Sequence, residues 1–390
     1  MKQGSVLSPI SNAGFGGATI MASRLVKHMH AESPWEMQVC LHAPGANAEL
    51  FEENGLQPDY LGVGQVCEGQ RKRLLRLLRY YGLASRLQTY GRIVPYLRRT
   101  RQDLVHIHNA PDLYTWGLVA KRLGVPVVWH VHAFHDKPVS KLALRLCDHM
   151  IFVSESTREH FERVGRLPPR SVVHNGVDVA LFREAGEREA AQARLGLAPG
   201  RLTLGFVGQL TWRKRPAWAV RAALDLLAAG IDLQMVIVGE DKSADGVHRT
   251  VLKRMIRDAG QGHRVHLLGF RNDVPEIMEA IDVLLFSSEE RGEAFPLVVL
   301  EAMASRTAVV STRSAGVPEA ITDGVTGLLA DADAYDEFVR QVDRVVGDPG
   351  LRETLAGAGQ GEARERFSIA RCADGVTSTY ERVLDRHRCT

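Results

Sequence analysis

The feature of this sequence that most limits its fold is a regular alternation of short apolar runs with helical stretches. The runs are nearly all apolar, which is typical of strands buried on both faces of a parallel sheet. The runs that we expect to form strands are 105–108, 125–132, 149–154, 171–174, 202–208, 233–239, 265–268, 283–286 and 308–311. The alternation predicts an α/β fold with helices on both faces of parallel sheets.

A charged, polar segment at 182–200 divides the chain. It ends in Pro199-Gly200, and a new apolar run begins directly after it. A length of 390 residues corresponds to two or three domains at ~150 residues each. We therefore expect two doubly wound, Rossmann-like domains facing each other across a cleft, at 1–185 and 186–367. The last helical stretch, 368–390, has no strand after it and could pack back on the first domain.

Composition excludes several classes of protein. The 49 Lys and Arg residues against 46 Asp and Glu give a net charge of +3, too near neutral to indicate a nucleic-acid partner. Five scattered cysteines without a CxxC pair indicate a reducing compartment. The first residues lack the apolar run of a signal peptide, and no stretch approaches 18 consecutive apolar residues. We expect a cytoplasmic protein.

One segment, Arg71–Arg101, departs from this balanced charge. It holds ten Lys and Arg residues and no Asp or Glu, and Leu74, Leu75 and Leu78 share one face of its helical pattern. One interpretation is peripheral docking on the anionic inner face of the cytoplasmic membrane. The other is a solvated helix whose arginines pair with carboxylates elsewhere. The sequence leaves both open.

Two glutamates eight residues apart frame the strongest candidate site. Glu293 precedes Pro296, and Glu301 lies further along the same apolar stretch. Proline suits the first turn of a helix, where its missing N–H group is not needed. The free N–H groups of such a helix can hold a phosphate, and a carboxylate on either side could accept hydrogen bonds from sugar hydroxyls. The alternative is structural, with Glu301 on the helix surface and Glu293 as a cap.

Other motifs accompany this pair, and together they resemble the family-4 retaining glycosyltransferases of the GT-B fold over nearly the whole chain. The motifs are Gly16-Gly17 after the first strand, Asn175-Gly-Val-Asp178 with Phe182, Gly208-Gln-Leu210 with Lys214, Glu301-Ala-Met-Ala304, Gly316-Val-Pro-Glu319 and Asp323-Gly-Val-Thr-Gly327. We interpret the Asn175 motif as a structural turn, because Asn and Gly tolerate the left-handed conformation.

The resemblance implies roles for residues of the second half. Glu293 would contact hydroxyls of the donor sugar, and Glu301 would bind the ribose. Backbone N–H groups of Leu297 and Val298 would hold the diphosphate. Lys214 would neutralise the leaving diphosphate as a compact ammonium. We count Glu293, Lys214 and His132 as the catalytic candidates.

In the first half, the resemblance places His132 in the pocket beneath the donor sugar, where a neutral imidazole could bond a hydroxyl. The five histidines at 106, 108, 130, 132 and 135 also suggest zinc, but no HExxH-like spacing supports a metal site. Gly16 and Gly17 would let the backbone approach a phosphate or acceptor closely. The other interpretation of Gly16 and Gly17 is an ordinary tight turn.

The chain departs from the family pattern at three positions. Gln209 stands in the donor site where arginine is usual, and Arg213 or Arg215 could supply the missing cation. Pro296 replaces a usual glycine and removes an N–H group, and Arg306 also replaces a glycine. Separately, Asp331-Ala-Asp333 looks like a metal-binding DxD pair, but a helical pattern follows it, so we expect a helix cap. No metal and no cofactor is expected.

The resemblance implies a retaining transferase that moves a hexose from a nucleoside diphosphate sugar to a hydroxyl acceptor. That acceptor would be a glycan or a lipid-linked intermediate of cell-surface polysaccharide synthesis. Two alternatives share the architecture: a sugar-nucleotide isomerase or phosphorylase, and a nonenzymatic sugar-nucleotide sensor. The substitutions at Gln209 and Pro296 motivate the sensor.

Overall fold

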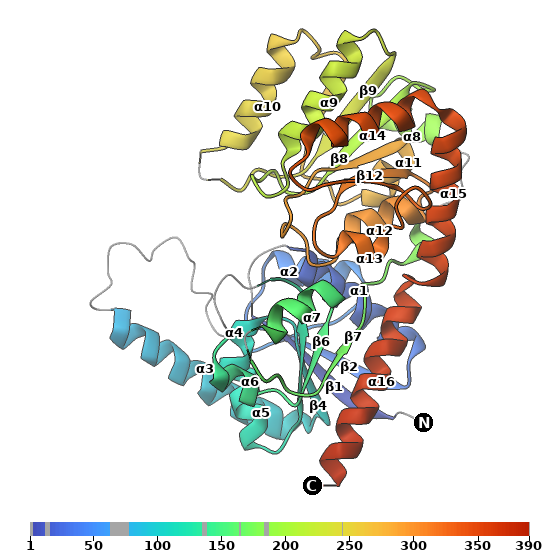
Figure 1. Ribbon diagram of the computed structural model, residues 1–390. Coiled ribbons are helices and arrows are strands. Elements are labelled where there is room, and N and C mark those ends of the chain that lie inside the picture. The colour runs from blue at the N-terminus through green and yellow to red at the C-terminus, as the bar shows by residue number, and fades with distance from the viewer. Residues whose placement is uncertain are drawn as a thin grey trace. The chain divides into compact units, whose positions relative to one another are not determined.

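The computed structural model describes residues 3–11, 16–62, 78–134, 139–163, 165–182, 187–243 and 245–389 (Figure 1). It divides into two units, the first formed by Met1–His174 with Ile369–Thr390 and the second by Asn175–Ser368. Each unit contains one parallel sheet with helices between its strands, as two Rossmann-like domains require. The division falls between His174 and Asn175, whereas the sequence analysis placed it at residue 185.

The first unit is built on a seven-stranded sheet in the order β3-β2-β1-β4-β5-β6-β7. Its strands are β1 (Gly4–Ile10), β2 (Trp35–Leu41), β3 (Asp59–Tyr60), β4 (Leu104–Ile107), β5 (Val127–Val131), β6 (His149–Phe152) and β7 (Arg170–Val172). All pairs are parallel. The strand order reverses between β1 and β4, so the carboxyl ends of these strands form the topological switch point where ligands bind in such sheets.

Helices cover both faces of this sheet. They are α1 (Gly17–Glu32), α2 (Ala46–Glu53), α3 (Leu78–Thr100), α4 (Ala110–Asp112), the π-helix η2 (Leu113–Gly117), α5 (Leu118–Arg122), α6 (Lys141–Arg145), α7 (Glu155–Glu162) and α16 (Ile369–Arg388). One face packs Trp116 and Trp129 into an apolar cluster. On the other, Tyr380 of α16 is fully buried against Trp35. The last helix therefore belongs to the first unit, and Figure 1 shows it in red.

The second unit has a six-stranded sheet in the order β10-β9-β8-β11-β12-β13. Its strands are β8 (Leu202–Val207), β9 (Leu233–Val238), β10 (Val265–Gly269), β11 (Val283–Phe286), β12 (Ala308–Thr312) and β13 (Leu328–Ala330). All pairs are again parallel. The order reverses between β8 and β11, so the loops after these two strands start side by side.

The helices of the second unit precede, connect and follow its strands. They are η3 (Val179–Leu181), α8 (Arg188–Arg194), α9 (Pro216–Ala228), α10 (Val247–Asp258), α11 (Val274–Ala280), α12 (Leu297–Ala304), α13 (Val317–Ala320), α14 (Tyr335–Gly347) and α15 (Pro349–Glu365). Local signals begin several helices. In α15, for example, Asp348 accepts a hydrogen bond from the backbone N–H of Leu351, and Pro349 occupies the first turn. In the described part of the chain, none of the helices is both long and apolar enough to cross a bilayer.

Candidate functional site

Two loops at the carboxyl edge of the second sheet carry most of the predicted donor-site residues. One loop follows β8 and the other follows β11. Hydrogen bonds tie them together: Ser287 Oγ donates to the carbonyl oxygens of Lys214 and Arg215 at 3.0 and 2.8 Å, and Glu289 N donates to Arg213 O at 2.8 Å. The backbone around Lys214 is therefore held against the loop that leads to α12.

An ion pair joins these loops at the centre of the site. The Nζ atom of Lys214 pairs with Oε1 of Glu293, and the two side chains are only 23% and 16% exposed. The ammonium also lies 5.5 Å from the centroid of the Phe286 ring. Burial lowers the pKa of Lys214 to about 7. The structure thus brings together two predicted catalytic residues far apart in sequence, a contact that no motif predicted.

The helix α12 begins beside this pair. Pro296 occupies its N-cap position, and Leu297 and Val298 are its first residues. The first N–H groups of a helix have no partner within it, so these two amides are available to an anion. Glu301 lies about one turn inside and is only 5% exposed. The structural alternative for the two glutamates is wrong, because Glu301 is buried and no side chain caps α12.

Two residues outside the glutamate motif hold the loop before α12. Asn175 is buried, and its Nδ2 atom donates to the carbonyl oxygen of Phe295 at 3.1 Å. Gly316 packs against the neighbouring peptide so closely that a Cβ atom there would lie 1.8 Å from Ala294 O. The sequence predicted only a turn at Asn175 and gave no sign of this contact. In the sequence, the one indication of a role for Asn175 was that it begins the motif Asn175-Gly-Val-Asp178.

The cations near Gln209 are already engaged. Gln209 is exposed just after β8. Arg213 lies 3.6 Å from a carboxylate oxygen of Glu289, and Arg215 pairs with Asp333 at 2.7 Å. Either arginine would have to leave its carboxylate to replace the missing cation.

In the first unit, Gly16 and Gly17 lie at the start of α1. Gly16 occupies the N-cap position with an extended backbone, and Gly17 is the first helical residue. A Cβ atom at Gly16 would meet no described atom within 4 Å. Packing against the described residues therefore does not require a glycine here.

His132 follows β5 and belongs to a group of four imidazoles on one face of the first sheet. These are His106, His108, His130 and His132. Burial lowers the pKa of His106 and of His132 to about 3, and the pKa of the other two well below 6.5. The four side chains are therefore neutral at physiological pH. The fifth histidine of the sequence cluster, at position 135, lies outside the described residues.

Three of these histidines are close enough to suggest a metal site. The candidate ligand atoms of His106, His108 and His130 lie within 4.8 Å of one another. The rings of His106 and His130 are stacked, however, with 10° between their planes and 5.3 Å between their centroids, while His108 is tilted by 36° and 31° relative to them. Nitrogen lone pairs lie in the ring plane, so those of near-parallel rings do not converge on one ion. Both nitrogens of His108 also have hydrogen-bond partners in the protein. This arrangement fits a stack of neutral rings better than a zinc site.

Comparison with known proteins decides the family. The model of Glycosyltransferase Family 4 matches residues 15–181, and that of Glycosyl transferases group 1 matches residues 187–362. The D-inositol 3-phosphate glycosyltransferase of Actinosynnema mirum is 31% identical over 311 residues, covering 73% of this chain and 74% of the relative. The chain belongs to the group 1 glycosyltransferases.

Two further relatives extend this comparison. The lipopolysaccharide core biosynthesis mannosyltransferase LpcC of Rhizobium leguminosarum is 30% identical, over 64% of this glycosyltransferase and 68% of LpcC. The crystal structure of Anabaena HepE in complex with UDP has a TM-score of 0.80 and 20% identity, covering 97% of this chain and 99% of HepE. HepE has also been solved with UDP-glucose. At this identity, the structural likeness shows the GT-B fold.

The aspartate pair of this glycosyltransferase is not a helix cap, so that prediction was wrong. The helix α14 has Ala334 at its N-cap position, with no side-chain cap bond. Asp333 instead pairs with Arg215 at 2.7 Å, and Asp331 lies 3.4 Å from Arg313. Both carboxylates face arginines instead.

Part of the basic segment of the glycosyltransferase lies outside the described residues, namely positions 71–77. The residues up to Thr100 form α3, which packs Ile93, Tyr96 and Leu97 into the core. Arg92 donates to the carbonyl oxygen of Leu61 at 3.0 Å, and the guanidinium of Arg99 lies 5.5 Å from the Tyr96 ring centroid. Neither contact is with a carboxylate.

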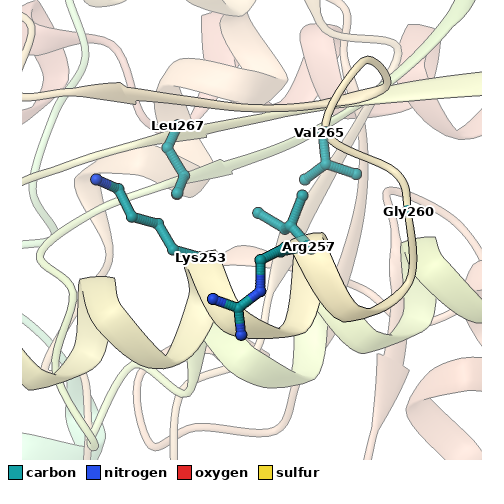
Figure 2. A pocket seen from close by; sticks show the side chains of 7 residues that line it. Lys253, Arg257, Gly260, Val265 and Leu267 are labelled. Atoms are coloured by element: carbon teal, nitrogen blue, oxygen red, sulfur yellow. The ribbon is translucent and has the colours of Figure 1, made fainter.

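A pocket of about 440 Å³ lies between α10 and β10 (Figure 2). Lys253 and Arg257 of α10 line one side, and Val265 and Leu267 of β10 line the other. Gly260 and Val265 place it toward the amino end of β10, away from the loops that carry Lys214 and Glu293. Ligands of doubly wound sheets bind at the carboxyl ends of the strands, so this pocket is not the donor site.

Proposed function

We propose that this glycosyltransferase transfers a hexose from a nucleoside diphosphate sugar to a hydroxyl acceptor, with retention of configuration. The observation that carries the proposal is the partly buried pair Lys214–Glu293 beside the amino end of α12, which no side chain caps. A cation and free amides suit a diphosphate, and a carboxylate suits sugar hydroxyls. The complexes of HepE with UDP and UDP-glucose support a donor of this class.

The proposed mechanism relies on positioning and on charge. Glu301 would hold the ribose, and the amides of Leu297 and Val298 would hold the diphosphate. Lys214 would stabilise the negative charge that develops on the leaving phosphate, while Glu293 binds a sugar hydroxyl. The acceptor would attack from the face that the diphosphate leaves, and a leaving phosphate oxygen would take the acceptor proton. This route needs no carboxylate nucleophile.

The first experiment is a thermal-shift screen of nucleoside diphosphates and their sugars, since a ligand of the folded state raises its melting temperature. Transfer assays with the selected donor would follow, with the anomeric configuration of the product read by NMR. Retained configuration in an acceptor-dependent product supports the proposal. An inverted product, free phosphate as the acceptor, or isomerisation of the donor would overturn it. Family membership favours transfer over the isomerase, phosphorylase and sensor alternatives.

We expect the Glu301→Ala variant to bind the donor nucleotide at least tenfold more weakly. A hydrogen bond to a charged group contributes ~1.5–3 kcal/mol, which corresponds to tenfold or more in affinity. Turnover at saturating donor should change less, because the ribose is remote from the reacting bond. Calorimetric titration with the nucleoside diphosphate measures the effect. The matched control is Glu365→Ala, an exposed glutamate in α15. Equal affinities of all three proteins would contradict the role of Glu301.

Turnover should not require a divalent metal. Lys214 and the amino end of α12 would supply the charge that a metal provides in other sites. The DxD-like aspartates are paired with Arg215 and Arg313 instead. We expect unchanged turnover after treatment with EDTA and gel filtration. Loss of activity that Mg²⁺ or Mn²⁺ restores would refute this expectation.

We further propose that the acceptor is a glycan or a lipid-linked intermediate, reached by peripheral binding of Arg71–Arg101 to an anionic membrane. Each basic residue near an anionic leaflet can contribute ~1 kcal/mol. The protein should therefore sediment with anionic vesicles more than with neutral ones, and less in high salt. Binding should fall when Arg71, Arg73, Arg76 and Arg79 are changed to Gln. The control changes Arg249, Lys253, Arg254 and Arg257 to Gln. Equal binding to both kinds of vesicle would contradict the proposal.

A further inference from the structure

Three polar side chains form a hydrogen-bonded chain at the carboxyl ends of neighbouring strands of the first sheet. Ser8 lies in β1, His108 follows β4 and His132 follows β5. Ser8 Oγ lies 3.1 Å from His108 Nε2, and His108 Nδ1 lies 3.0 Å from His132 Nε2. This chain lies at the topological switch point between β1 and β4, where this kind of sheet binds its ligands.

The buried hydroxyl of Ser8 determines which atom donates in each of these hydrogen bonds. A neutral imidazole has one nitrogen that donates and one that accepts, so each hydrogen bond determines the next. Ser8 is fully buried, and His108 Nε2 is its side chain's one hydrogen-bond partner among the described residues. If His108 donated to Ser8, the hydroxyl hydrogen would remain buried without an acceptor, which is costly. Ser8 therefore donates to His108 Nε2.

The protonated nitrogens of His108 and His132 follow from this hydrogen bond. Because Nε2 of His108 accepts, its Nδ1 carries the hydrogen and donates to Nε2 of His132. Nε2 of His132 then accepts, and its Nδ1 carries the hydrogen. Within the described part of the chain, His132 Nδ1 has no hydrogen-bond partner. The N–H group of His132 that ends this series of hydrogen bonds thus has no acceptor among the described residues.

We propose that Ser8 and His108 are positioning residues that hold His132 as the Nδ1–H tautomer, so that it donates a hydrogen bond to an oxygen of the donor sugar. This proposal rests on the proposed function and on the family resemblance, which implies that His132 lies beside that sugar. The other tautomer would present a lone pair, which cannot bond an ether or ring oxygen. The hydrogen bonds from Ser8 through His108 therefore determine that His132 can bind a sugar oxygen that accepts a hydrogen bond.

The tautomer can be measured without any substrate. In protein labelled with ¹⁵N-histidine, long-range ¹H–¹⁵N correlation spectra distinguish protonated from unprotonated ring nitrogens, and loss of the signal in His132→Gln assigns it. We expect a protonated Nδ1 in the wild type and a mixture of tautomers in Ser8→Ala. The control is Ser171→Ala, which removes a hydroxyl 3.0 Å from His149 in the same unit. A protonated Nε2 of His132 in the wild type, or an unchanged tautomer in Ser8→Ala, would overturn the proposal.

Turnover provides the second readout. We expect His108→Phe, which keeps a ring but no hydrogen bond, to lower kcat about tenfold through misplacement of His132. Affinity for the nucleoside diphosphate should not change, because His108 is not among its predicted ligands, most of which lie in the second unit. His108→Asn should recover activity, since its amide N–H can replace Nδ1–H. If the tautomer is as expected but His108→Phe retains full kcat, His132 does not serve the transfer and its place in the proposed function fails. If His108→Phe does not fold, the tautomer in Ser8→Ala and the turnover of His108→Asn still test the proposal.

Discussion

Replacing Lys214 with alanine is expected to lower turnover by about 10²–10³-fold, the usual effect of removing one preorganised group that stabilises charge in the transition state. The variant also leaves Glu293 partly buried without the cation that faces it. Turnover should be measured at saturating donor, so that weaker binding does not contribute. The control is Lys253→Ala, because Lys253 is an exposed lysine of α10 in the same unit. Turnover within threefold of the wild type would remove Lys214 from the mechanism.

The same lysine predicts the alkaline side of the pH profile. Only the protonated amine can neutralise a leaving diphosphate, and burial lowers its pKa to about 7 in the free enzyme. The value of kcat/KM for the donor should therefore fall as pH rises above about 7. In kcat the fall should come at higher pH, because a bound diphosphate favours the charged amine. In Lys214→Arg this fall should disappear, since the guanidinium stays charged.

The Gly316→Ala variant is expected to lose about 10²-fold in turnover through a contact that involves no reacting atom. Its Cβ would lie 1.8 Å from Ala294 O and 2.8 Å from Ala294 C, and both of these neighbouring atoms belong to the backbone. The peptide next to Glu293 must therefore shift, and a displacement of about 1 Å in a reacting group can cost 10²-fold in rate. Turnover and the melting temperature should be measured together, to separate local displacement from unfolding.

A matched control for this variant is Gly347→Ala, at the end of α14. A Cβ atom there would meet no described atom within 4 Å. Alanine should be tolerated or slightly stabilising at that position, because it reduces the entropy of the unfolded chain. Full activity of Gly316→Ala would show that the loop before α12 adapts without consequence. Loss of activity in both variants would indicate a general effect of adding a methyl group.

Much of the fold could be predicted from the sequence because the evidence for it is local. The expected run 283–286 coincides with β11, and 202–208 with β8 apart from one residue. Buried parallel strands are continuously apolar, so the pattern lies within a few adjacent residues. Strand β2 was not among the predicted runs, since Glu36 and Gln38 interrupt its apolar pattern. These residues nevertheless form a strand, because β2 pairs with β1 along its whole length.

The sequence by itself also determined the family, through motifs whose residues lie close together in the chain. It could not show that Lys214 meets Glu293, that Asn175 supports Phe295, or that Ser8 reaches His132 through His108. These contacts join residues up to about 120 positions apart. The contacts of Lys214 with Glu293 and of Ser8 with His108 depend on strand orders that reverse between neighbours, at β8 and β11 and at β1 and β4, and no short pattern encodes those orders. Burial then decided the chemistry, because the same lysine or imidazole in water would have an ordinary pKa.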